Sequence, residues 1–293
     1  MDICPRDEHK TLEWITVLCS AKLPYRLSYD DGKWMIHVPA SSAEVAHREI
    51  DTYEEENRDW PPRDVDFLGL PVTRGTKWAA GLAAATVLLF FAWLGPYRPY
   101  HDVLRAASMD SAAVVSGEFW RLLTCLTVHA DLTHVLSNTV CLFFFTLAVC
   151  QCMGTGLGLF LILVSAAAAN AAVAFGSGMR HVAVGASSAC FAAVGILSSN
   201  HFIRRLRGCA GDRVARGRAW ISLFAGLGLL GVLGTGPRSD LSAHAFGFVF
   251  GMLLCLPFSW FGVDRFSRWG QCILGVLAVA ALAGAWCLVA FVV

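Results

Sequence analysis

Seven long hydrophobic runs occupy the chain from Trp78 onward. Each reaches or approaches the roughly 20 residues that a membrane helix needs. Backbone N–H and C=O groups cannot stay unpaired in lipid, so each run is expected to be a helix. The runs cover residues 78–94, 133–149, 157–175, 186–203, 219–234, 241–261 and 271–293. The sequence therefore predicts a multi-pass, all-α membrane protein.

Composition agrees with this class and excludes several others. Hydrophobic residues make up 56% of the chain, which is unusual for a soluble domain. A net charge of +1 gives no indication of a nucleic-acid partner. The 11 cysteines lie largely inside the apolar runs and lack the spacing of a zinc site or a secreted disulfide framework. We therefore expect no metal and no cofactor.

The first part of the chain is polar and patterned differently. Helical spacing covers Thr11–Leu23, and two short strands are expected at Tyr25–Tyr29 and Lys33–Val38, joined by a turn. Ser41-Ser42-Ala43-Glu44 is typical of a capping box and opens a helix to about Asn57. The pattern predicts a small α+β domain of α-β-β-α order. Because it carries no catalytic cluster, we interpret it as an accessory module, through which a homo-oligomer could form.

These patterns divide the chain into four parts. They are a small domain at 1–60, a linker at 61–77, a six-helix core at 78–262 and an additional membrane helix at 263–293.

Arginine placement predicts the orientation. The segment between the fourth and fifth runs contains six arginines and only one acidic residue, Asp212. This excess of positive charge favours the cytoplasmic side of the membrane. Those arginines are Arg204, Arg205, Arg207, Arg213, Arg216 and Arg218. Counting outward from this segment, the N-terminus is expected in the cytoplasm and the C-terminus outside.

Two polar residues open two of the runs at the same depth. Ser187 begins the fourth run and His244 lies near the start of the sixth, and both runs go from outside to inside. A lone serine on a membrane helix more often serves helix packing. A serine and a histidine at one depth, however, form a candidate nucleophile and base. No carboxylate is in register with His244, because Asp240 lies a full turn earlier, so a dyad is expected.

The second run supplies candidate hydrogen-bond donors. His134 and Asn138 are four residues apart and share one helix face. They could simply tie helices together. With Ser187 in place, they could instead stabilise an oxyanion together with the Ser187 backbone N–H. Phe191, one turn after Ser187, could stack on His244.

Taken together, these residues resemble the rhomboid intramembrane serine proteases. The matching residues are Trp120 and Arg121, then His129, His134 and Asn138, then Gly185-Ala186-Ser187, then Ala243-His244 with Gly247 and Gly251. The resemblance implies a rhomboid-like six-helix bundle plus one C-terminal helix, behind a cytosolic domain like that of some bacterial rhomboids. It also implies the bacterial inner membrane as location, lipid as surroundings and single-span membrane proteins as substrates, cut near the outer face.

Other features bear on packing and access. Gly247 and Gly251 lie on one face of the sixth helix, and the lack of side chains there would let this helix approach the fourth closely. The long segment Gly95–Leu132 is expected to be a structured scaffold, anchored at the membrane interface by Trp120 and Arg121. The glycine-rich fifth helix and the cap at 235–240 are then the parts expected to move and admit substrate.

Two departures from the family pattern leave an alternative open. Ser188 stands where glycine usually follows the nucleophile, and Cys150-Gln151-Cys152 lacks the acidic residue often found after the second helix. A catalytically weak or inactive rhomboid-like protein that binds membrane segments is therefore a second hypothesis. A small transporter is a third, although the sequence shows neither a repeat nor charged pathway residues.

Overall fold

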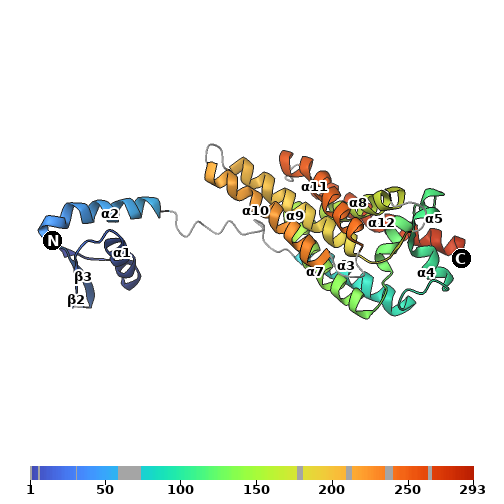
Figure 1. Cartoon of the computed structure of the whole chain (residues 1–293), viewed down its shortest axis with the longest axis horizontal. Helices are drawn as coiled ribbons and strands as arrows, with labels where there is room; N and C mark the ends of the chain where they lie inside the picture. The colour runs from blue at the N-terminus through green and yellow to red at the C-terminus, as the bar shows by residue number, and fades with distance from the viewer. Residues whose placement is uncertain are drawn as a thin grey trace. The chain divides into compact units, whose positions relative to one another are not determined.

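The computed structural model describes residues 2–5, 7–30, 32–58, 74–176, 181–208, 213–234, 240–262 and 266–293. The chain divides into two compact units, Met1–Phe67 and Leu68–Val293 (Figure 1). The predicted linker up to residue 73 and the predicted cap at 235–239 lie outside the described residues.

The N-terminal unit is a three-stranded antiparallel sheet with two helices. Its elements are β1 (Asp2–Ile3), α1 (Glu8–Ser20), β2 (Arg26–Asp30), β3 (Lys33–His37) and α2 (Ala43–Glu56). The strand order is β1-β3-β2. Its core consists of Ile3, Leu18, Ile36, Val38, Ala46 and Ile50. The sequence did not predict β1, because two residues are too few to show an alternating pattern.

The helix starts in this unit differ from the expected ones. α1 begins at Glu8 rather than Thr11, because the Asp7 side chain accepts a hydrogen bond from Lys10 N at 2.8 Å and caps the helix. The predicted capping box before α2 is wrong. A short 3-10 turn, η1 (Ala40–Ser42), precedes α2, and Ser42 makes no side-chain capping hydrogen bond. The turn instead pairs Ser42 N with Pro39 O at 2.9 Å.

All seven predicted runs form helices in the second unit. They are α3 (Arg74–Leu94), α7 (Leu132–Met153), α8 (Thr155–Gly176), α9 (Ser187–Gly208), α10 (Arg213–Gly234), α11 (Leu241–Phe261) and α12 (Arg268–Val292). Among the described residues, α3, α7, α8, α11 and α12 are long and apolar enough to cross a membrane. α9 is not, because polar side chains and arginines fill its second half, and α10 contributes only the shorter apolar stretch Ala219–Val232.

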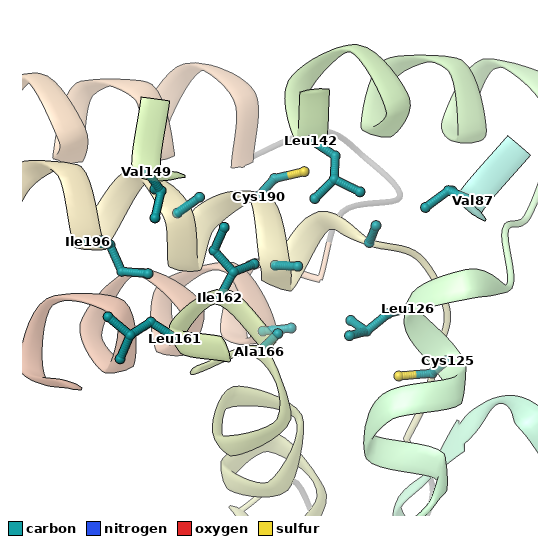
Figure 2. Packing of buried hydrophobic residues seen from close by; sticks show 14 of the residues in the cluster. Val87, Cys125, Leu126, Leu142, Val149, Leu161, Ile162, Ala166, Cys190 and Ile196 are labelled. Atoms are coloured by element: carbon teal, nitrogen blue, oxygen red, sulfur yellow. The ribbon is translucent and has the colours of Figure 1, made fainter. Parts of the chain in front are cut away.

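α9 is the central helix of this unit. It packs against α7, α8, α10 and α11. Cys190 and Ile196 of α9 face Leu142 of α7 and Ile162 of α8 in the buried cluster of Figure 2. Ser187 therefore lies at the first turn of the helix that the bundle surrounds.

The long segment between α3 and α7 is structured, as the sequence predicts. It contains α4 (Asp102–Ala107), β4 (Met109–Asp110), α5 (Ser111–Val115), α6 (Arg121–Thr124) and η2 (Cys125–Thr127). β4 pairs antiparallel with β5 (Val182–Ala183), which leads into α9. The loop is thereby joined directly to the chain that precedes Ser187.

Trp120 and Arg121 hold this loop together from inside. Arg121 is buried within the protein. It donates to the carbonyls of Arg105 (2.5 Å) and Ser108 (2.9 Å), and it pairs with Glu118 at 2.6 Å. Trp120 Nε1 donates to Ala106 O at 3.2 Å. Both side chains therefore satisfy carbonyls of the loop itself, which makes the loop a firm scaffold.

The C-terminal helix α12 is fastened to the turn between α7 and α8. Gln271 donates from Nε2 to Met153 O (3.0 Å) and accepts at Oε1 from Leu157 N (2.9 Å). Its side chain thus pairs with the end of one helix and the start of the next. Gly156 lies so close to the Gln271 carbonyl that no side chain fits there.

Candidate active site

Two side-chain nitrogens converge on Gly185, two residues before Ser187. A Cβ built on Gly185 would lie 2.6 Å from His134 Nε2 and 3.3 Å from Asn138 Nδ2. Gly185 also has a φ of +120°, which L residues with a side chain rarely adopt. Glycine therefore leaves a small space beside the start of α9 that two N–H groups border.

The orientation of His134 is fixed by the first turn of α7. Asp131 caps this helix by accepting from His134 N at 2.8 Å. His134 Nδ1 accepts from Ala130 N at 3.4 Å. Because Nδ1 acts as an acceptor, we assign the proton of the neutral ring to Nε2. The nitrogen that faces Gly185 is thus a donor.

Asn138 presents a second donor on the same helix face. Its side chain is buried, and Nδ2 has no hydrogen-bond partner among the described residues. An unsatisfied buried donor costs about 1–3 kcal/mol. Such a group is often explained by a ligand or a reacting atom that satisfies it during function. The two donors and the Gly185 space are therefore suited to hold a developing oxyanion.

Ser187 is the first residue of α9 and is half-buried. The N–H groups of a helix's first turn lack intrahelical acceptors, so the Ser187 N–H is available beside the same space. The preceding chain is held on the first loop. Gly185 N donates to Cys125 O at 2.9 Å, and Ala186 N donates to His129 Nε2 at 3.3 Å.

His129 is entirely buried, and its ring lies 5.0 Å from that of His134. Burial, with a smaller contribution from His134, lowers the pKa of His129 to about 3. The neutral ring can then accept at Nε2, as the bond from Ala186 requires. His129 is a positioning residue for the segment that carries Ser187.

α11 approaches α9 through glycines on both helices. A Cβ on Gly247 would lie 2.6 Å from Ser188 O, and Gly251 lies directly against Ala192 O. Gly195 of α9 lies in the same way against Phe248 O. These contacts agree with the predicted face of small residues on α11. Ser187 and His244, on the first turns of α9 and α11, both lie at one end of the contact between the two helices.

His244 is buried on the first turn of α11. Its ring centroid lies 4.6 Å from that of Phe191, with the planes inclined by 34°. This is the contact expected from the spacing between Ser187 and Phe191. Phe191 therefore limits the orientations open to the imidazole.

Asp240 has a role that the sequence did not indicate. It caps α11 by accepting from Ala243 N at 3.0 Å, and its other oxygen lies 2.6 Å from His181 Nε2. Ser111 of the first loop donates to the carbonyl of His181 at 2.9 Å. The pair joins the segment before Ser187 to the helix of His244. Only the tertiary structure reveals it, because 59 residues separate the partners.

Ser188 fits its position without displacing the α9–α11 contact. It is 2% exposed, and its hydroxyl makes no hydrogen bond within the described part of the chain. The backbone carbonyl, not the side chain, faces Gly247. Ser188 thus adds a buried hydroxyl next to Ser187.

Several apolar helices of membrane-spanning length define a polytopic membrane protein, and Ser187 and His244 lie on the first turns of two of its packed helices. A family model described as the rhomboid domain matches residues 116–261. The chain belongs to the rhomboid family. No curated protein matches it.

Proposed function

We propose that this protein is an intramembrane serine endopeptidase that cleaves transmembrane proteins near the outer membrane face. The supporting observation is the pair of donors, His134 Nε2 and Asn138 Nδ2, that borders the Gly185 space next to Ser187. Membership of the rhomboid family supports the same reaction class.

In this proposal, Ser187 Oγ attacks the scissile carbonyl while His244 takes its proton. The carbonyl oxygen becomes an oxyanion, which accepts hydrogen bonds from His134, Asn138 and the Ser187 N–H. His244 then gives its proton to the leaving amine. Water, activated by the same histidine, releases the second product from the acyl-enzyme.

The proposed setting is the bacterial inner membrane, with the N-terminal unit in the cytoplasm and the C-terminus outside. The proposed substrates are single-span membrane proteins, and the positive-inside distribution of arginines supports this orientation. Self-association through the N-terminal unit remains a separate proposal.

A fluorophosphonate probe tests the assignment. We expect it to label the wild-type protein in membranes and to leave Ser187→Ala unlabelled, since the probe reacts with activated serines. His244→Ala should lose labelling as well, because the serine then lacks its base. Cleavage of a membrane substrate by the purified Ser187→Ala protein would refute the proposal.

An inactive, membrane-segment-binding rhomboid is the second candidate. The observation that favours it is Ser188, whose buried hydroxyl has no partner among the described residues. Wild-type protein that resists the probe, and gains reactivity on Ser188→Gly, would support this candidate over the first.

A further inference from the structure

An open cavity of about 580 Å³ lies between α3, α4 and α12, outside the candidate active site, and Trp93 and Val279 in its lining are largely exposed. Its walls include Phe90 and Trp93 of α3, Val103 of α4, and Leu282, Ala283 and Trp286 of α12. α3 and α12 are both long and apolar enough to cross a membrane. In a membrane, a space between two such helices would open to hydrocarbon.

The walls are almost entirely apolar. Two of the polar groups in the lining are already paired: Thr86 donates to Leu82 O at 2.8 Å, and Trp286 Nε1 donates to Thr127 Oγ1 at 3.2 Å. No charged side chain lines the cavity. Water needs two to four polar partners to occupy a cavity. The occupant that matches these walls in charge and polarity is a hydrocarbon chain.

The aromatic side chains give the cavity a defined wall. Phe90 and Trp286 are stacked, with centroids 4.6 Å apart, and Trp93 lies 6.3 Å from Trp286. Rigid rings lose little conformational entropy when they contact a ligand. Because lipid tails surround the protein in any case, selective retention depends on such packing, not on the hydrophobic effect.

We propose that this cavity binds one acyl chain of a membrane phospholipid. The bound chain would pack against Trp286, which is hydrogen-bonded to the first loop at Thr127, two residues before His129. Tyr97 N also donates to His129 O at 2.8 Å. The site thus adjoins the scaffold of the candidate active site, although binding itself does not depend on proteolysis.

The test uses the full-length protein in vesicles that contain a phospholipid with a diazirine midway along one acyl chain. After illumination, peptide mass spectrometry locates the adducts. We expect them on the cavity-facing residues of α3 and α12. Ala283→Phe should fill the cavity and abolish these adducts, whereas Ala280→Phe, an exposed position of α12 that does not line the cavity, should retain them.

Val279→Trp is a second cavity-filling variant if Ala283→Phe does not fold, as judged by its gel-filtration profile. Equal labelling of the filled and control variants, or adducts spread evenly around α12, would overturn the proposal. So would a covalent dimer formed through this face, since a second copy of the chain would then be the occupant.

Discussion

The ring of His129 accepts a hydrogen bond at Nε2 from the backbone N–H of Ala186, at 3.3 Å. A residue of the first loop thereby fixes the segment immediately before Ser187. The ring is fully buried and must be neutral to accept this bond. The stability of the folded protein therefore depends on pH.

Replacing His129 with glutamine should remove part of the acid sensitivity of the fold. Between the unfolded pKa of 6.5 and the folded pKa of about 3, the unfolded chain binds the proton and the folded chain does not. The free energy of unfolding therefore decreases as pH falls. At pH 5 the loss due to this histidine is roughly 2 kcal/mol relative to neutral pH. His129→Gln retains an acceptor but cannot titrate. Thermal unfolding between pH 7 and pH 5 should show a smaller loss in the variant, and equal losses would contradict the burial argument.

Gly185→Ala should abolish cleavage. The added Cβ would lie 2.6 Å from His134 Nε2, in the space proposed for the oxyanion, and φ +120° would be strained at alanine. We expect turnover to fall by at least about 10²–10³-fold, the effect of losing one oxyanion donor. Gly228→Ala on α10 is the matched control, because nothing lies within 4 Å of its Cβ position. A Gly185→Ala protein with normal turnover would place the oxyanion elsewhere.

Asn138→Ala should lower turnover and leave the folded state intact. Its Nδ2 has no partner among the described residues, so removing it costs no side-chain hydrogen bond in the resting protein. The loss in turnover should be about 10²-fold, at the lower end for one donor, because His134 and the Ser187 N–H remain. Kinetics and thermal unfolding of the same preparation separate these effects. A large fall in melting temperature with normal turnover would make Asn138 a packing residue.

Gly156→Ala should detach α12 at its N-terminal end. An alanine Cβ would meet the carbonyl oxygen of Gln271, and backbone cannot move aside as a flexible side chain can. Overpacking of this kind typically costs about 1–3 kcal/mol. The expected result is a lower melting temperature, with Gly228→Ala again as the control. An unchanged melting temperature would mean that α12 contributes little to the stability of the bundle.

The sequence by itself determined the class and the candidate residues. Hydrophobic runs of membrane length predict helices because lipid leaves backbone groups no other partner, and all seven became helices. The spacing of His134 and Asn138 placed both on one face of α7, and Gly247 and Gly251 predicted the close contact with α9. Local periodicity carries this information, so no tertiary structure was needed.

Only the tertiary structure decided how distant segments support one another. The bonds from Ala186 to His129, from His181 to Asp240 and from Gln271 to the α7–α8 turn join residues far apart in sequence. Which partner satisfies a buried polar group depends on packing, and packing has no local sequence signature. For the same reason the sequence did not reveal that Arg121 donates to the carbonyls of Arg105 and Ser108 in the first loop.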